Sequence, residues 1–182
     1  RFVAEGNTPD PNDLEIVYNI AAGPQYKLAE IALDGLEQAQ DDDPARLRTE
    51  FGLKSGDVIN SDEIVSAAVR LDEMLAETGY AFAKAGEPEL VIDHAARDGD
   101  LSLIVTPGGR YEFGKITMAD TQLFGPDHAQ LIARFDPGDV YKASDVEDLR
   151  RALIATSLVS TVTLIPVRSD EPGKVDLAVN IT

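Results

Sequence analysis

Few side chains in this sequence could carry out acid–base or metal chemistry, and they lie far apart. His94 and His128 are the only histidines. Zinc binding or paired catalysis would need both to converge with carboxylates. The run Asp41–Asp43 lacks the alternating ligands and the glycine of a calcium loop. We therefore predict that both histidines lie on the surface, and that the aspartates cap a helix and face solvent.

Other catalytic motifs are also incomplete. Gly108 and Gly109 are followed by Arg110, whereas a phosphate-binding loop continues with Gly-Lys-Ser/Thr. The serines lack the context of a nucleophile elbow. The chain has no cysteine, which excludes disulfides, thiol catalysis and cysteine-ligated metals. We predict that this protein is not an enzyme and that it has no cofactor and no metal site.

Composition narrows the class of protein and its partners. The chain has 182 residues, 43% of them hydrophobic, which is enough for one domain or two small ones. Its net charge is −17, with 33 acidic and 16 basic residues, which argues against binding nucleic acid or anionic lipid. Apolar runs stay well short of the ~18 residues that a membrane-spanning helix needs.

The sequence contains an internal repeat. IAAGPQYKLAEIAL begins at Ile20 and TPGGRYEFGKITM begins at Thr106; both run through a Gly-containing turn to a Tyr, an apolar residue and an Ile. Further along each copy, Gly-Asp-Val recurs at residues 56–58 and 138–140. Because the residues downstream also match, we interpret the chain as two copies of one module.

Each copy predicts the same order of elements. A strand follows the Gly-Tyr turn, two helices come next, and two strands joined by a Gly- and Asp-containing turn complete the module. The predicted fold class is α+β, with tandem modules at residues 24–108 and 109–182. We interpret residues 1–23 as the C-terminal hairpin of a preceding, truncated module.

In the first module, the helices are predicted from caps and apolar spacing. Asp43 and Ser61 are the expected N-caps, and Gly52 is expected to end the first helix. The second helix carries an apolar stripe that we expect to face the core, formed by Ile64, Ala67, Ala68, Leu71 and Leu75.

The second module shows related signals. Pro126 is expected to open its first helix, with Leu131 and Phe135 as an apolar pair one turn apart. Ser144 and Glu147 form a capping-box pattern at the start of its second helix. That helix should bury Leu149 and Leu153.

Proline positions predict the order of strands in each sheet. Pro88 and Pro166 fall in the first strand of each terminal hairpin, and proline is confined mainly to edge strands because it lacks a backbone donor. The last strands contain LSLIV and VDLAVNI, which are free of proline and rich in apolar residues. We therefore predict that the last strand is central and the proline-bearing strand lies at an edge.

This ordered set resembles the POTRA (polypeptide-transport-associated) family, the periplasmic modules that precede the membrane barrel of outer-membrane assembly and secretion proteins. Within the family, the stretch Gly79–Ile116 is most similar to the translocation and assembly module branch. The resemblance implies a three-stranded mixed sheet covered on one face by two helices. It also implies a location at the periplasmic face of the bacterial outer membrane, with a membrane barrel expected after the second module.

The resemblance further implies partners. These are unfolded outer-membrane or autotransporter polypeptides as clients, an inner-membrane-anchored partner subunit, and the chain's own C-terminal β-barrel. Nucleic acid is not expected as a partner.

The exposed sheet edges are the candidate binding surface, because an unpaired edge can accept another chain by β-augmentation. The candidate edge residues are Ala81, Phe82, Ala83, Lys84 and Ala85 in the first module, and Val159, Ser160, Thr161, Val162, Thr163 and Leu164 in the second. The expected junctions between modules are Gly23, Pro24, Gly108 and Gly109. The alternative is a passive structural spacer between the barrel and a periplasmic partner, without client binding.

Overall fold

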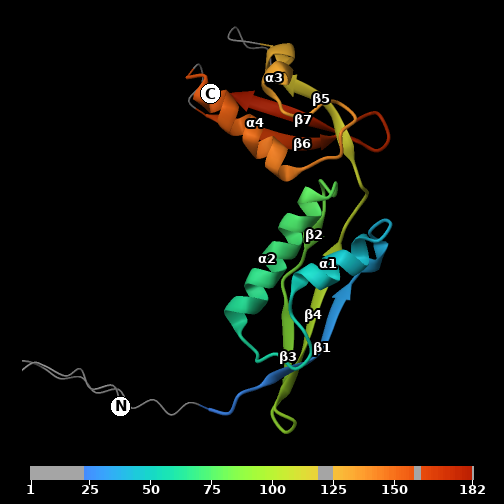
Figure 1. The fold of residues 1–182 in the computed structure, drawn as a ribbon, viewed down its shortest axis with the longest axis vertical. Helices are drawn as coiled ribbons and strands as arrows, with labels where there is room; N and C mark the ends of the chain where they lie inside the picture. Colours follow the sequence, from blue (N-terminus) through green and yellow to red (C-terminus); the bar gives the residue numbers. More distant parts are fainter. Residues whose placement is uncertain (1–22, 119–124, 158–160, 182) are drawn as a thin grey trace, which may run out of the picture.

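The computed structural model describes residues 23–118, 125–157 and 161–181, which form two α+β modules stacked along the long axis of the molecule (Figure 1). Of the predicted N-terminal hairpin at residues 1–23, all but Gly23 lies outside the described residues. The first module consists of β1 (Lys27–Asp34), the short 3-10 helix η1 (Leu36–Gln38), α1 (Asp43–Phe51), α2 (Ser61–Glu77), β2 (Lys84–Ala85), β3 (Glu89–Asp93) and β4 (Asp98–Thr106). The second consists of β5 (Glu112–Met118), α3 (Pro126–Ile132), α4 (Ala143–Ala155), β6 (Val162–Arg168) and β7 (Lys174–Ile181).

The predicted fold class and strand order are confirmed in both sheets. In the first sheet, β4 lies between the parallel strand β1 and the antiparallel strands β2 and β3. In the second sheet, β7 lies between the parallel strand β5 and the antiparallel strand β6. The last strand of each module is therefore central, and its two neighbours form the edges.

The edge strand of the first module is interrupted, unlike the continuous strand that we expected. Ala85 pairs with Val105 in β2, but Glu89 pairs with Ser102 in β3, so the edge strand contains one extra residue between them. Pro88 lies in this interruption, where its missing backbone donor leaves no ladder bond unmade. In the second module, Pro166 instead lies within β6, opposite Leu177.

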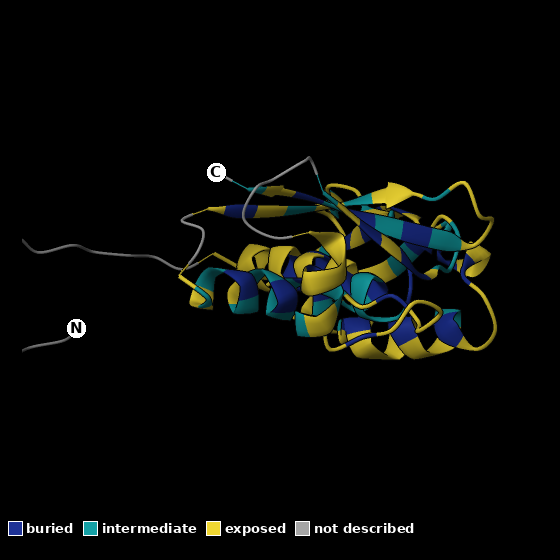
Figure 2. Ribbon diagram, turned by 90° about the horizontal axis from the view of Figure 1, so that it is seen from above, coloured by how far each residue is buried: buried dark blue, intermediate teal, exposed yellow. Residues whose placement is uncertain are grey.

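Two helices pack on one face of each sheet and enclose a separate hydrophobic core. All five residues of the predicted stripe on α2 are buried, and so are Leu149 and Leu153 on α4. In Figure 2 the buried residues of the helices face the sheet, and exposed residues cover the outside. The apolar periodicity in the sequence thus identifies the buried face of both long helices.

Two helix-start predictions in the first module were displaced by one residue. Asp42 precedes α1 as its N-cap, and Asn60 precedes α2 and accepts the backbone N–H of Asp62. Asp43 is itself inside α1 and buried: its carboxylate accepts the hydroxyl of Tyr80 at 2.8 Å. The prediction that Asp41–Asp43 face solvent is therefore wrong for Asp43. Gly52 ends α1 in the left-handed conformation, as predicted.

The apolar pair predicted for the first helix of the second module is wrong. The helix α3 begins at Pro126 as expected, but it ends at Ile132, before Phe135. Leu131 is 84% exposed, and Ala129 supplies the buried contact of this short helix. Phe135 reaches the core from the following loop, where its ring stacks on Phe113 with centroids 3.8 Å apart.

The capping box predicted for α4 is also wrong. The helix begins at Ala143 after Lys142, so Ser144 lies inside the first turn rather than at the N-cap. Glu147 does not reach back to the helix start, because its carboxylate accepts two hydrogen bonds from Arg150.

The repeated Gly-Asp-Val element closes a turn against the first strand of each module. Gly56 and Gly138 adopt positive φ angles of 94° and 101°, which glycine tolerates without strain. The Asp57 carboxylate accepts the N–H of Lys54, and the Asp139 carboxylate accepts the N–H of Asp136, both at 2.8 Å. The turn then pairs with the outer edge of β1 or β5.

A second feature common to the modules lies at a bulge in the first strand. The pairing register shifts between Leu28 and Ile31 in β1, and at the matching place in β5. The N–H of Glu30 donates to Asp100 on the central strand at 3.1 Å, and the N–H of Lys115 donates to Asp176 at 2.7 Å. A carboxylate on the open face of each sheet therefore satisfies the donor that the bulge displaces from the ladder.

Candidate functional site

The predicted edge segment of the first module is mostly not strand. Only Lys84 and Ala85 lie in β2, whereas Ala81, Phe82 and Ala83 precede it. The N–H of Ala83 donates to the carbonyl of Tyr80, so these residues form a turn after α2. This part of the predicted edge cannot present the extended backbone that strand addition requires.

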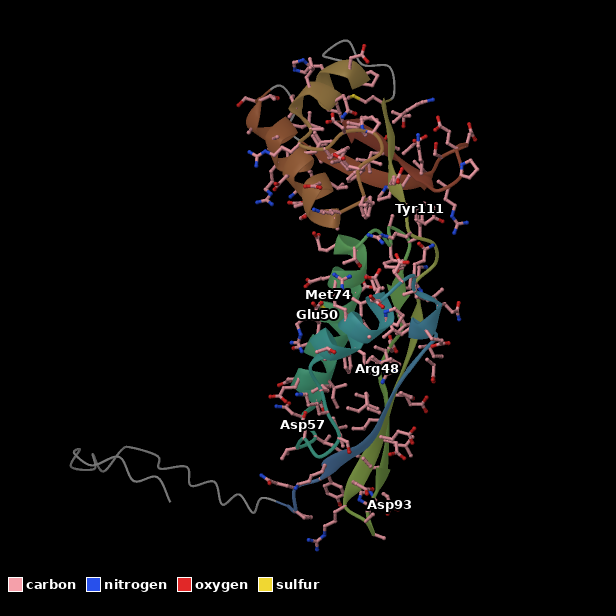
Figure 3. All side chains as sticks on the ribbon, turned by 45° about the vertical axis from the view of Figure 1, so that its right-hand side comes forward. Arg48, Glu50, Asp57, Met74, Asp93 and Tyr111 are labelled. Atoms are coloured by element: carbon pink, nitrogen blue, oxygen red, sulfur yellow. The ribbon has the colours of Figure 1, made fainter. Side chains whose placement is uncertain are left out.

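The side chains of this turn serve the contact between the modules instead. Ala81 and Phe82 pack against the hydrophobic core of the second module. The ring of Phe82 meets Tyr111 edge-on, with centroids 5.1 Å apart, and the guanidinium of Arg168 lies 5.2 Å from the Phe82 centroid. Figure 3 shows Tyr111 at the junction, at the opposite end of the first module from Asp93.

The outward-facing donor of β2 is already occupied. Gly86 donates its N–H to the carbonyl of Ile104 on β4, so the neighbouring Ala85 directs its N–H away from the sheet. That N–H donates to Asp72 on α2 at 3.0 Å. With Pro88 lacking a donor and Ala85 capped by Asp72, the β2 part of this edge is protected in the way natural edge strands are.

In the second module, the predicted edge segment overlaps the start of β6. Val159 and Ser160 lie outside the described residues, Thr161 precedes the strand, and Val162, Thr163 and Leu164 lie in it.

Hydrogen bonding at the hairpin indicates which groups of β6 point outward. Ser169 donates its N–H across the hairpin to the carbonyl of Lys174. Counting back from Ser169, every second residue therefore directs its backbone N–H and C=O groups toward β7. The residues between them direct their backbone groups away from the sheet: Val162, Leu164, Pro166 and Arg168. Pro166 occupies one of these outward positions, which is where an edge strand tolerates proline.

The side chains of β6 are sorted between the two faces of its sheet. Val162 is buried and Leu164 packs on the core beneath the helices. On the open face, Ile165 is 45% exposed and Val167 is 42% exposed. An added strand along this edge would therefore extend both an apolar core face and a partly apolar open face.

The histidines occupy separate modules. Nδ1 of His94 lies 2.9 Å from the hydroxyl of Tyr26, beside the β3–β4 turn of the first module. His128 lies on α3 in the second. Among the described residues, no group of three or more His, Cys, Asp or Glu side chains could hold a metal ion. Within the same residues, none of the helices has the length and apolar character to cross a membrane.

The predicted junction glycines lie at two different places. Gly108 and Gly109 connect β4 to β5, and Gly108 has a positive φ of 71°. Gly23 and Pro24 precede β1 and are exposed.

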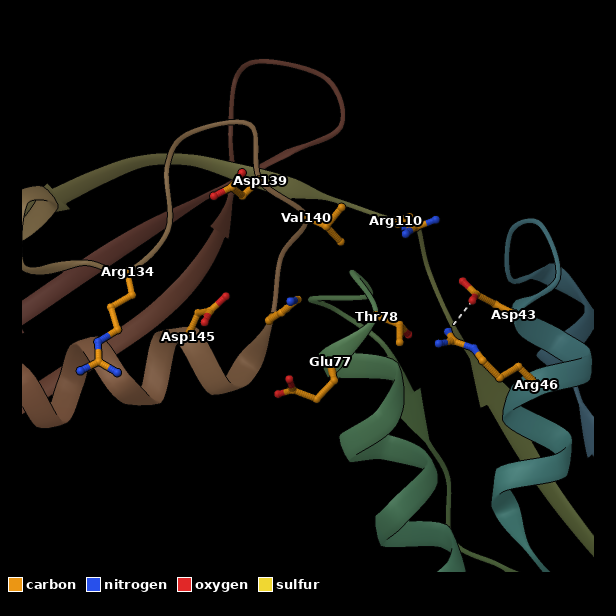
Figure 4. A pocket seen from close by; sticks show the side chains of 10 residues that line it. Asp43, Arg46, Glu77, Thr78, Arg110, Arg134, Asp139, Val140 and Asp145 are labelled. Atoms are coloured by element: carbon orange, nitrogen blue, oxygen red, sulfur yellow. Dashed lines mark hydrogen bonds and ion pairs between the residues drawn. The ribbon is translucent and has the colours of Figure 1, made fainter.

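A polar cleft of about 700 Å³ opens where the modules meet (Figure 4). Residues of both modules line it. From the first come Asp43, Arg46, Glu77 and Thr78; Arg110 comes from the connection; and Arg134, Asp139, Val140, Lys142 and Asp145 come from the second. Cations and carboxylates are equal in number, four of each, so the cleft lacks the single sign of charge that would select a charged ligand.

Comparison with known proteins finds a family match for the first module. Residues 26–108 match the POTRA family, described as a surface antigen variable number repeat. The matched residues contain the two helices, the mixed sheet and the central last strand described above.

Solved structures extend the likeness across both modules. POTRA domains 3–5 of BamA from Haemophilus influenzae share 20% identity, with a TM-score of 0.67, over 88% of this chain and 62% of that one. BamA from Haemophilus ducreyi lacking POTRA domains 1–3 gives a TM-score of 0.69 at 18% identity, over 86% of this chain and 29% of that one. POTRA domains 1–2 of the periplasmic domain of Omp85 from Anabaena give 0.54 at 16% identity, covering 87% and 96%. The fold of the pair is therefore that of tandem POTRA domains, and the chain spans less than two thirds of the first two structures.

Proposed function

We propose that this chain is the periplasmic POTRA region of an outer-membrane assembly or secretion protein, and that β6 binds extended client polypeptides by β-augmentation. The observation that carries the proposal is the difference between the two edges. The outward N–H of β2 is capped by Asp72. Leu153 in the second module matches Leu75 in the first, so Arg150 matches Asp72. A guanidinium group has no hydrogen-bond acceptor, so Arg150 cannot cap an N–H as Asp72 does.

Backbone pairing suits a module that handles many clients. Hydrogen bonds to main-chain groups provide affinity with little dependence on the client's sequence, and side chains on alternate positions add selectivity. Along β6, Val162, Leu164 and Arg168 offer outward N–H groups, and the Pro166 carbonyl remains available as an acceptor. The proposed binding edge is thus Val162–Arg168, shifted toward the C-terminus from the segment that the sequence suggested.

The parent protein and its partners are part of the proposal. The family match and the fold support a protein whose POTRA modules are joined to its own C-terminal membrane barrel. The resemblance of Gly79–Ile116 to the translocation and assembly module supports its barrel subunit, TamA, as the parent. Outer-membrane or autotransporter polypeptides are then the clients, and an inner-membrane-anchored subunit is a second partner.

The test is capture of a urea-denatured outer-membrane barrel polypeptide, diluted into solutions of the chain carrying a photo-crosslinker at Ile165. Leu164→Pro removes one outward donor and should lower the crosslinked yield, whereas Leu164→Val keeps the donor and should retain it. Pro166→Ala adds a donor in the outward row and should raise the yield. Circular dichroism of each variant establishes that the module is folded.

The passive spacer is the second candidate, and the close packing of Phe82 and Tyr111 at the junction favours it. A spacer needs a fixed angle between modules but no open edge. It predicts equal crosslinked yields from the folded Leu164→Pro, Leu164→Val and Pro166→Ala variants, which would overturn client binding at β6.

A further inference from the structure

The second helix of each module begins at a matching place in the repeat but is capped differently. At the start of α2, the side chain of Asn60 accepts the N–H of Asp62 at 3.0 Å. Gly138 in the second module matches Gly56 in the first, so Lys142 matches Asn60. The lysine side chain has no acceptor atom, and α4 has no side-chain cap at its own N-cap residue. The second module therefore lacks the side-chain cap that the first module has at this position.

The missing cap comes from the preceding module. The carboxylate of Glu77, at the last residue of α2, accepts the backbone N–H of Ser144 at 2.6 Å and the Ser144 hydroxyl at 2.7 Å. Ser144 matches Asp62 in the repeat, so the same backbone donor is satisfied in both helices. The acceptor differs: it is the residue before the helix in α2 and a residue of the neighbouring module in α4.

Helix dipoles make this arrangement dependent on orientation. A carboxylate in the last turn of a helix is unfavourable, because the helix C-terminus carries partial negative charge, and α2 has no basic residue there. The N-terminus of α4 carries partial positive charge and stabilises an anion. Figure 1 shows the end of α2 lying beside the start of α4. Glu77 is therefore well placed electrostatically only while the two modules keep this relative orientation.

The surrounding contacts hold the two helix ends together. The N–H of Tyr111 donates to the carbonyl of Gly79 at 2.8 Å. Gly79 has a φ of 102°, and a Cβ at this position would lie 2.7 Å from Cγ of Arg110. Burial, together with the negative charge of Glu77, raises the pKa of the Tyr141 hydroxyl. The carboxylate thus acts on groups of the second module from the wall of the cleft between the modules.

We propose that Glu77 is a latch, a helix cap supplied across the junction that fixes the angle between the two modules. The latch also fixes the position of the β6 edge relative to the first module. It does not depend on client binding at that edge.

The first test measures the distance between the modules. The chain contains no cysteine, so Ser66→Cys on α2 and Ala155→Cys on α4, both exposed, allow two spin labels to be placed without further change. Electron–electron double resonance should give one narrow distance peak in the labelled protein. Glu77→Ala should abolish the narrow peak, whereas Glu73→Ala removes an exposed carboxylate one turn earlier on α2 and should leave it intact.

The second test separates the latch from the stability of α4. Lys142→Asn restores the cap residue found in the first module, so Ser144 gains an acceptor from its own module. Backbone hydrogen exchange of Ser144 should accelerate roughly tenfold in Glu77→Ala and return to the original rate when Lys142→Asn is added, since a cap stabilises a helix end by that order. The narrow distance peak should stay absent from this double variant.

The results have opposite meanings for the proposal. Recovery of Ser144 protection without recovery of the distance peak supports a latch. A narrow peak that survives in Glu77→Ala would show that the remaining contacts fix the angle alone, and would overturn it. A narrow peak that returns in the double variant would also overturn it, because only the helix end would then have needed a cap.

Discussion

The two modules share the hydrogen bonds that close their turns and strand bulges, and they differ at a sheet edge and at the start of the second helix. Both close the Gly-Asp-Val turn with an aspartate, and both satisfy the bulge in the first strand with an aspartate on the central strand. These carboxylates meet demands set by the fold itself, because each accepts an N–H that has no partner in the ladder. Both modules of this chain therefore carry them.

The differences lie at the edge of the sheet and at the start of the second helix. The first module caps its edge with Asp72 and its second helix with Asn60. The second has Arg150 and Lys142 at those positions, and its helix is capped by Glu77 of the first module. The first module thus satisfies both groups from within, whereas the second depends on its neighbour for one. The comparison places the difference at the β6 edge and at the start of α4, the two regions that the proposals above concern.

The largest expected effect tests whether the cores are equivalent. Leu75 and Leu153 occupy matching helix positions, and both are fully buried. Leu75→Ala and Leu153→Ala should each lower the free energy of unfolding of their own module by ~2–5 kcal/mol, as large-to-small core changes do. Urea unfolding followed by circular dichroism measures this. A loss below ~1 kcal/mol in one module alone would break the equivalence of the two cores.

The next effect tests the aspartates at the bulges. Asp100→Ala and Asp176→Ala remove the acceptors of the Glu30 and Lys115 N–H groups and should each cost about 1 kcal/mol of unfolding free energy. Asp100→Asn and Asp176→Asn keep an acceptor oxygen and serve as matched controls. Hydrogen exchange at Glu30 and Lys115 should accelerate in the alanine variants only. Unchanged exchange there would show that water replaces the carboxylate.

These aspartates show where sequence reasoning succeeded and where it failed. The buried stripe Ile64–Leu75 and the strand order followed from periodicity and from Pro88 and Pro166, because those signals are local. The role of Asp100 depends on a bulge in a strand distant in sequence, although the shared Asp-Leu pair at 100–101 and 176–177 marks the position.

The cap from Glu77 and the edge cap from Asp72 could not have been predicted from local patterns. Each joins an N–H to a carboxylate that only the tertiary structure brings within reach. The same reason explains the error at Ser144, whereas Glu147 is bound by Arg150 of its own helix. Their spacing satisfies the capping-box pattern. In the structure, however, the Ser144 hydroxyl donates to the Glu77 carboxylate, and the Glu147 carboxylate accepts a hydrogen bond from Arg150.

A smaller effect tests the difference between the edges. Asp72→Ala should free the outward N–H of Ala85 and raise photo-crosslinking of a denatured barrel polypeptide from a probe at Val91, an exposed residue of β3. The unfolding free energy should fall by about 1 kcal/mol or less, the net contribution of one hydrogen bond. Glu73→Ala removes a neighbouring carboxylate and serves as the control. Equal yields from the two variants would show that Asp72 does not protect this edge.

The smallest effect concerns carboxylates at the two hairpin turns, which are both exposed but are stabilised by different partners. The N–H groups of Ala96 and Ala95 lower the pKa of Asp93 from its ordinary value of 3.8. A hydrogen bond and the charge of Lys174 lower the pKa of Glu171 from 4.5. Both carboxylates favour the folded state above the ordinary value, and this contribution is lost as pH falls through the lowered one.

Salt separates the two causes of the lowered pKa. Screening at about 1 M salt acts over ~3 Å and weakens the exposed Glu171–Lys174 pair, whereas the backbone N–H groups at Asp93 are fixed dipoles held by the turn. Carboxyl carbon NMR titrations at low and high salt should therefore show the Glu171 pKa rising toward its ordinary value. The Asp93 pKa should move less, and Lys174→Ala should raise only that of Glu171. Equal shifts with salt at both sites would show that long-range charge, rather than the turn, sets the pKa of Asp93.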